Sequence, residues 1–354
     1  MFLVWVLPGA HLQSGPTASR SQLALQKSDR ITIDTPRLRG SISLNGGRID
    51  DLQLLDYNVR LNDESEKVTL LSPAGAPNAY FTMYGWAPAG SLSFEDVPGA
   101  TTNWSVDGNN ILTESTPVSL VWKNTTGLTF RRDISIDENY LFSITQEVIN
   151  NSSSKLEIYP YRLIKRINTP KTINFFILHE GLISLVNDEL LEKNYDDLLD
   201  DCSASMPVKD TFCDAKGQGG WLGFTDKYWM SVLIPDPNEP INVNYRHGNN
   251  GRDSYRTGYV GQIFDISPGE TIRYQGKLFA GAKKLDILSD YLDELSIPRF
   301  TDAIDWGWFA FLTKPVSYAI NWFYGYAGNF GLAIIAFTIL MRLILFPLAH
   351  ASFK

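Results

Sequence analysis

The chain has 354 residues, enough for one large domain or two ordinary ones. Charged residues make up 20% of it and the formal net charge is −8, so its average composition is that of an acidic soluble protein. This acidity and the lack of a basic stripe in the sequence argue against nucleic acid as a partner.

The first 29 residues lack the pattern of a folded domain. The apolar run 2–7 is too short to cross a bilayer, and no basic residues precede it as they would in a signal peptide. Two interpretations stay open: the remnant of an N-terminal membrane segment, or a wrongly assigned start. Residues 12–28 are polar and serine-rich and are typical of a linker.

From Arg30 onward, apolar and polar residues alternate with the period of half-buried strands. Turn-forming residues separate these stretches, as in 45–47 (NGG) and 123–127 (KNTTG). The alternating stretches that we assign to strands are 30–33, 40–44, 118–122, 128–130 and 140–149. So many short strands predict a mainly β fold, a large β-sandwich over residues 30–300.

A helix is expected at the end of this domain. Leu285, Leu288, Leu292 and Leu295 fall on one face of a helix over about 283–296, and Pro298 would stop it.

The following stretch, 301–326, is unusually rich in aromatic residues. Tryptophan and tyrosine concentrate where hydrocarbon meets water, so we expect an amphipathic helix in a membrane interface. Its predicted anchors are Trp306, Trp308, Trp322 and Tyr324. The alternative is a helix that covers one end of the sandwich.

Residues 327–349 carry a single charge, Arg342. At about 1.5 Å per residue, a helix of this length crosses the roughly 30 Å hydrocarbon core, so we predict a transmembrane helix. Acidic residues precede it and Lys354 follows it, which favours an extracytoplasmic sandwich and a cytoplasmic C-terminus at 350–354.

Arg342 is costly in such a helix, by about 2.5–3.5 kcal/mol on insertion scales. Two interpretations are open from the segment alone. The side chain extends to the cytoplasmic headgroups with its stem in lipid, or it faces a wet cavity between helices and offers its charge to something passing through. Pro347 favours a bend near the cytoplasmic end.

The two cysteines, Cys202 and Cys213, lack the spacing of a zinc site. In an extracytoplasmic domain they would close a loop as a disulfide; otherwise they are two unpaired thiols.

Three blocks of the sequence resemble a known family. They are 219–223 (GGWLG) followed by Tyr228-Trp229 and Ile234-Pro235, then 305–308 (DWGW) with 313–315 (TKP), and finally 328–331 (GNFG) with 342–348 (RLILFPL). On these blocks the chain resembles the YidC membrane-protein insertases of Gram-negative bacteria, from about residue 30 to its end.

The resemblance implies a galactose-mutarotase-like super-sandwich in the periplasm and an inner-membrane protein that inserts and folds membrane proteins, with or without the Sec translocon. It implies that Arg342 lies in a hydrophilic groove and attracts acidic parts of substrate segments, without covalent chemistry or a cofactor. The implied partners are nascent membrane proteins, membrane lipids, Sec components and, through regions missing here, the ribosome. Because the family continues with a cytoplasmic hairpin and further membrane helices, we expect the chain to be a fragment of a multi-pass protein.

Two other hypotheses remain. A membrane-tethered carbohydrate-binding or mutarotase-like module would need an acid and a base in one pocket. His179-Glu180 is the adjacent candidate pair and His247 a further lone candidate, but neighbouring strand residues point to opposite faces, so we expect no catalysis and no metal site. A periplasmic interaction module that docks translocon or folding partners is the third hypothesis, and it is compatible with the first.

Overall fold

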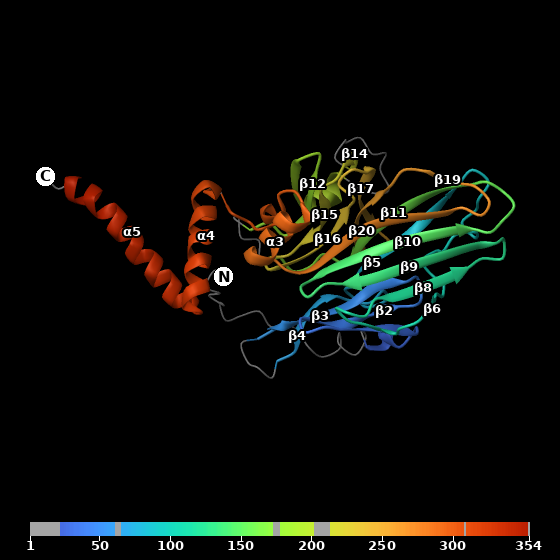
Figure 1. The fold of residues 1–354 in the computed structure, drawn as a ribbon, viewed down its shortest axis with the longest axis horizontal. Coiled ribbons are helices and arrows are strands. Elements are labelled where there is room, and N and C mark those ends of the chain that lie inside the picture. The colour runs from blue at the N-terminus through green and yellow to red at the C-terminus, as the bar shows by residue number, and fades with distance from the viewer. Residues whose placement is uncertain (1–21, 61–64, 173–177, 202–212, 308, 353–354) are drawn as a thin grey trace. The chain divides into compact units, whose positions relative to one another are not determined.

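The structure is a computed structural model that describes residues 22–60, 65–172, 178–201, 213–307 and 309–352. These residues fall into two compact units (Figure 1). One is mainly β and ends at Ala303, and the other is helical and begins at Ile304.

The first sheet of the β unit has 11 strands, in the order β14-β17-β18-β11-β5-β3-β2-β1-β7, with β19 paired to β11 and β4 to β3. Strands β1 and β7 pair in parallel, and the other strand pairs among the described residues are antiparallel. The bounds are β1 Arg30–Asp34, β2 Leu38–Ser43, β3 Arg48–Asn58, β4 Lys67–Leu71, β5 Tyr80–Ala89, β7 Ile111–Leu112, β11 Leu156–Ile167, β14 Asp214–Gln218, β17 Pro240–Asn249, β18 Asp253–Val260 and β19 Phe264–Ile266.

The second sheet has nine strands, in the order β13-β12-β15-β16-β20-β10-β9-β8-β6. Its centre is the pair β10 and β20, which runs in register from Leu141 opposite Phe279 to Ile149 opposite Thr271. The bounds are β6 Ser105–Val106, β8 Val118–Lys123, β9 Leu128–Ile136, β10 Leu141–Asn150, β12 Gly181–Val186, β13 Glu189–Asn194, β15 Trp221–Thr225, β16 Trp229–Pro235 and β20 Thr271–Ala282. The short helix α2, Tyr195–Asp201, follows β13.

The alternation seen in the sequence places one face of each strand in the core. Along β9 and β11 every second residue is buried, as expected for strands with one face against the core. The predicted mainly β sandwich is therefore confirmed, and the stretches predicted as strands from Arg30 and from Val118 correspond to β1 and β8.

Two buried arginines link the facing sheets. Arg132 of β9 donates hydrogen bonds to the carbonyl oxygens of Gly47 and Tyr84, beside and within the first sheet. Arg162 of β11 donates to the carbonyl oxygens of Ile144 and Tyr274 in the second sheet, at 3.0 and 3.2 Å. Burial lowers the pKa of Arg132 to about 10, a value at which the side chain still carries its charge near neutral pH.

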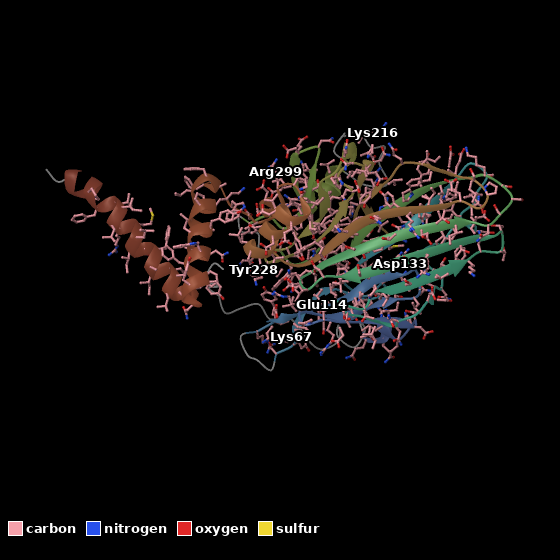
Figure 2. The ribbon with its side chains drawn as sticks, viewed as in Figure 1. Lys67, Glu114, Asp133, Lys216, Tyr228 and Arg299 are labelled. Carbon is pink, nitrogen blue, oxygen red and sulfur yellow. The ribbon has the colours of Figure 1, made fainter. Side chains whose placement is uncertain are left out.

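The end of the β unit is closed by α3, Leu285–Leu295, and the 3₁₀ turn η1, Phe300–Ala303. The predicted helix is thus present, one or two residues shorter at each end than expected. It ends in a left-handed residue, Ser296, with φ of 54°. Trp221, fully buried, donates its indole N–H to the carbonyl oxygen of Pro298 and packs edge-on against Phe300. Arg299, labelled in Figure 2, ion-pairs with Asp302 at 2.8 Å.

The helical unit consists of α4, Ala310–Ala327, and α5, Phe330–Ser352. Of the stretch 301–326 that we expected as an aromatic helix, the first three residues belong to η1 and α4 begins at Ala310. Between the helices, Gly328 adopts φ of 61°, and the side-chain oxygen of Asn329 caps α5 by accepting the backbone N–H of Gly331 at 2.8 Å.

Candidate functional sites

The helix α5 carries the arginine that the sequence singled out. Within the described residues it is the one helix long and apolar enough to cross a membrane: Phe330–Pro347 has a mean hydropathy of 2.2, and 6% of this window is buried. Arg342 is exposed on it and makes no ion pair with another described side chain. A single exposed charge on a helix of this kind has to reach headgroups, water or a substrate.

Two of the four predicted aromatic anchors, Trp322 and Tyr324, lie on α4. Trp322 is 59% exposed and Tyr324 38% exposed, whereas Trp306, just before the helix, is half-buried. The Lys314 ammonium lies 5.6 Å from the Trp306 ring centroid, a cation–π contact. Trp308 lies outside the described residues. None of the α4 residues is buried within the structure.

One aromatic contact joins the two helices of this unit. The ring of Tyr324 stacks on that of Phe330, with centroids 4.0 Å apart. This contact and the Asn329 cap hold the start of α5 against the end of α4.

The two candidate histidines, His179 and His247, bond to different partners in the described part of the chain. His179 and Glu180 precede β12 instead of lying in a strand, and the Nε2 of His179 is 2.7 Å from the carbonyl oxygen of Leu182. His247 is buried on β17, and its Nε2 lies 3.0 Å from Asp253 Oδ1. Neither histidine lines the cavity described below.

Only one of the two cysteines predicted to form a disulfide, Cys213, is among the described residues. Cys213 is fully buried, and its carbonyl oxygen accepts hydrogen bonds from the backbone N–H of Tyr245 and the side chain of Arg246. Cys202 lies outside the described residues, so the disulfide stays a prediction. Among the described residues no group of three or more histidine, cysteine, aspartate or glutamate side chains could hold a metal ion.

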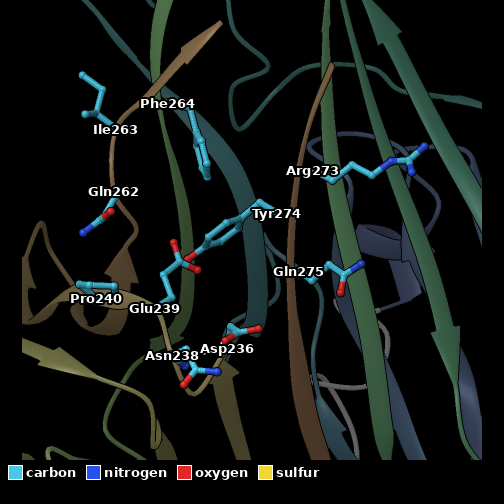
Figure 3. Close-up of a pocket in the computed structure, with 10 residues that line it drawn as sticks. All are labelled: Asp236, Asn238, Glu239, Pro240, Gln262, Ile263, Phe264, Arg273, Tyr274 and Gln275. Carbon is cyan, nitrogen blue, oxygen red and sulfur yellow. Dashed lines mark hydrogen bonds between the residues drawn. The ribbon is translucent and has the colours of Figure 1, made fainter. Parts of the chain in front are cut away.

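A cavity that the sequence did not predict lies where the two sheets meet (Figure 3). It has a volume of about 490 Å³ and is bounded by the turn between β16 and β17, the connection from β18 to β19, and β20. Asp236 and Glu239 line it from the turn, and Tyr274 lines it from β20. Figure 3 shows the Glu239 carboxyl and the Tyr274 hydroxyl pointing toward one another.

The environment of Glu239 is unusual for a carboxylate near the surface. Burial raises its pKa above the ordinary value of 4.5, and the contacts with Tyr274, the Arg162 charge and the backbone of Gln262 offset part of that rise. The Tyr274 hydroxyl is buried and faces this carboxyl without a well-aligned hydrogen bond. These two side chains come from segments far apart in the sequence, so no local pattern could have paired them.

Comparison with known proteins supplies the family. Residues 30–319 match the family model of the YidC periplasmic domain. The chain is 44% identical over 348 residues to "Membrane protein insertase YidC" of Dinoroseobacter shibae, covering 98% of this chain and 57% of that protein. It is 46% identical over 317 residues to the protein of the same name from a Ruegeria species, covering 89% of this chain and 52% of that protein. The chain thus spans a little over half the length of these relatives.

The solved structures found as similar are far more distant in sequence. A galactose mutarotase related enzyme from Lactobacillus acidophilus has a TM-score of 0.46 at 10% identity, covering 71% of this chain and 97% of that one. A galactose mutarotase-like protein from Lactobacillus casei has a TM-score of 0.42 at 11% identity, covering 71% and 100%. Likenesses of this strength carry no argument about activity.

The fold and the apolar helix define the class: β-sandwich proteins that carry a helix long enough to cross a membrane. The chain belongs to the YidC family, as the match over residues 30–319 shows.

Proposed function

We propose that this chain is part of a membrane protein insertase, which helps integral membrane proteins insert and fold in the bacterial inner membrane, with or without the Sec translocon. The observation that carries the proposal is the similarity over 98% of the chain to a relative named "Membrane protein insertase YidC". In this proposal the protein moves and shelters polypeptide segments and catalyses no covalent reaction.

In this proposal each segment of the chain has its own location relative to the membrane. Residues 30–300 form a periplasmic domain, 301–326 rest in the membrane interface through the aromatic anchors, and 327–349 span the inner membrane toward a cytoplasmic segment at 350–354. In the complete protein, other membrane helices would enclose a groove around Arg342. Nascent membrane proteins are the substrates, and Sec components, lipids and the ribosome are the further partners.

Arg342 is the residue expected to act on substrates. An exposed guanidinium on an otherwise apolar helix attracts the acidic residues of a segment that has to cross the bilayer, since a charge in low dielectric interacts strongly with its opposite. The cost of placing the arginine in the helix is tolerated if it faces a wet groove instead of lipid.

The test uses the complete gene product that contains this chain, reconstituted in vesicles. Two single-span reporters differ only in the translocated segment, which carries acidic residues in one and glutamines in the other. We expect Arg342→Ala to slow insertion of the acidic reporter about tenfold, corresponding to about 1.4 kcal/mol, and to leave the neutral one unchanged. Arg342→Lys should retain most activity.

Ile344→Ala, an exposed apolar position on the same helix, is the matched control. Equal insertion of both reporters by Arg342→Ala would favour an arginine that only reaches the headgroups. A complete product that inserts neither reporter would overturn the insertase proposal itself.

A further inference from the structure

We propose that the cavity between the β16–β17 turn and β20 binds an organic cation, the ammonium or guanidinium group of a lysine or arginine side chain presented by a polypeptide. This inference goes beyond the insertase proposal and does not depend on it, because it concerns a site in the β unit.

The charges at the cavity favour a cation. Neither Asp236 nor Glu239 forms an ion pair with another described residue. Arg273 lines the cavity but its Nε is bound to Glu147 at 2.5 Å, and Figure 3 shows its side chain pointing away from Glu239. Arg162 lies behind Tyr274, fully buried, and offsets part of the Glu239 charge from inside the sandwich. The lining therefore carries two carboxylates without an ion pair among the described residues, and its one cation, Arg273, pairs with Glu147.

The cavity also offers an acceptor and an aromatic wall. Tyr274 is 3% exposed and lines the cavity, and its hydroxyl has no well-aligned hydrogen-bond partner among the described residues. The ring of Phe264 packs edge-on against that of Tyr274, with centroids 6.2 Å apart. Ammonium and guanidinium groups bind favourably to carboxylates and phenol oxygens, and over an aromatic ring such as that of Phe264.

Gly261 lies next to the lining residue Gln262 and leaves space beside the side chains of Tyr274 and Glu239. A Cβ atom built on it would lie 2.8 Å from the Tyr274 hydroxyl and 2.9 Å from Glu239 Oε1. Its backbone is outside the left-handed region, but the added methyl group would also lie 2.9 Å from Pro160 Cγ, so the side chains around it have to shift. The volume of about 490 Å³ leaves room for a long side chain and the backbone that carries it.

The test titrates the whole chain in detergent, by calorimetry, with three blocked amino acids: N-acetyl-lysine amide, N-acetyl-arginine amide and N-acetyl-norleucine amide. A seven-residue glycine-serine peptide with one central lysine is the fourth probe. We expect saturable binding of the two cations and none of norleucine, and binding of the peptide at least threefold tighter than that of blocked lysine. Equal binding of norleucine would overturn the proposal, and equal affinity of peptide and blocked lysine would overturn its polypeptide part.

Two variants place the binding in this cavity. Glu239→Gln and Gly261→Ala should each weaken binding of the cations at least tenfold, while Glu114→Gln, which removes an exposed carboxylate outside the cavity (labelled in Figure 2), should leave it unchanged. Near-ultraviolet circular dichroism checks that each variant is folded. If Glu239→Gln or Gly261→Ala misfolds, the result for the other variant decides whether the cations bind in this cavity. Unchanged cation binding by a folded Glu239→Gln or Gly261→Ala variant would overturn the assignment.

Discussion

The guanidinium of Arg162 lies 5.1 Å from the ring centroid of Tyr274 and donates a hydrogen bond to the carbonyl oxygen of the same residue. Arg162 belongs to the first sheet and Tyr274 to the second, so this contact spans the core. Arg162 also donates hydrogen bonds to the carbonyl oxygen of Ile144 and, from Nε, to Gln146 Oε1, both at 3.0 Å, and together these fix the plane of the guanidinium. Gly276 leaves the space that this group occupies, since a Cβ there would lie 2.1 Å from Nη1.

Replacing Arg162 should therefore destabilise the β unit strongly. Arg162→Ala removes three hydrogen bonds and leaves a cavity and buried carbonyl groups without partners, so we expect a loss of about 3 kcal/mol or more in the free energy of unfolding. Urea unfolding followed by tryptophan fluorescence measures it. Arg39→Ala, at a side chain that is 64% exposed, is the control and should change stability by less than about 0.5 kcal/mol. Similar losses in both variants would contradict the role of Arg162.

The sequence held part of this information. Along β9 and β11 the alternation that buries Phe130 and Ile158 also places Arg132 and Arg162 on the inward face. Local periodicity therefore predicts the strands and which residues face the core. It cannot pair β10 with β20, or bring Glu239 to Tyr274, because these contacts join segments that only the whole topology brings together. The contact of Phe300 with distant Trp221 is a further example.

The glycines of the 219–223 block have a steric role that can be tested. Gly220 has φ of 79°, and a Cβ on it would lie 1.8 Å from the carbonyl oxygen of Leu185. Gly75 also has a positive φ, of 98°, but nothing lies within 4 Å of the position of its Cβ. We expect Gly75→Ala to cost about 1 kcal/mol from backbone strain alone, and Gly220→Ala to cost at least about 3 kcal/mol because the backbone also has to move.

Thermal and urea unfolding of the two alanine variants distinguish backbone strain at positive φ from a steric clash of the added methyl group with Leu185. Equal costs would mean that the turn before β15 relaxes freely around the added methyl group. The block would then be explained by backbone conformation alone.

Two aspartates should give opposite dependences of stability on pH. Burial raises the pKa of Asp51 above its ordinary 3.8, partly offset by the hydroxyl of Ser41 at 2.6 Å. The folded state then binds the proton more tightly than the unfolded state, so the contribution of Asp51 is full below about pH 4 and is lost as pH rises through the folded pKa. Asp51→Asn should therefore gain stability relative to the wild type as pH rises from about 3 to 6.

The contribution of Asp96 to stability depends on pH in the opposite direction. The backbone N–H and hydroxyl of Ser93, at 2.9 and 2.8 Å, lower its pKa, so its contribution is present above the ordinary pKa of 3.8 and is lost as pH falls through the folded value. Asp96→Asn should be less stable than the wild type near pH 7, and the difference should vanish in acid. Urea midpoints measured across this pH range would contradict the assignment if both variants moved in the same direction.

The redox state of the two cysteines tests whether the β unit lies in the periplasm. In an oxidising periplasm Cys202 and Cys213 should form a disulfide that closes a short loop. Protein alkylated with iodoacetamide in denaturant should gain no adduct without a reductant and two adducts after reduction, as intact mass would show.

Loss of a disulfide that closes a loop of this length should lower the free energy of unfolding by about 3 kcal/mol. Cys202→Ser combined with Cys213→Ser is compared with Ser153→Ala at an exposed position, which should have no effect. Two adducts without reduction, in protein trapped with acid at lysis, would mean that the pair is reduced, and they would count against a periplasmic location of residues 30–300.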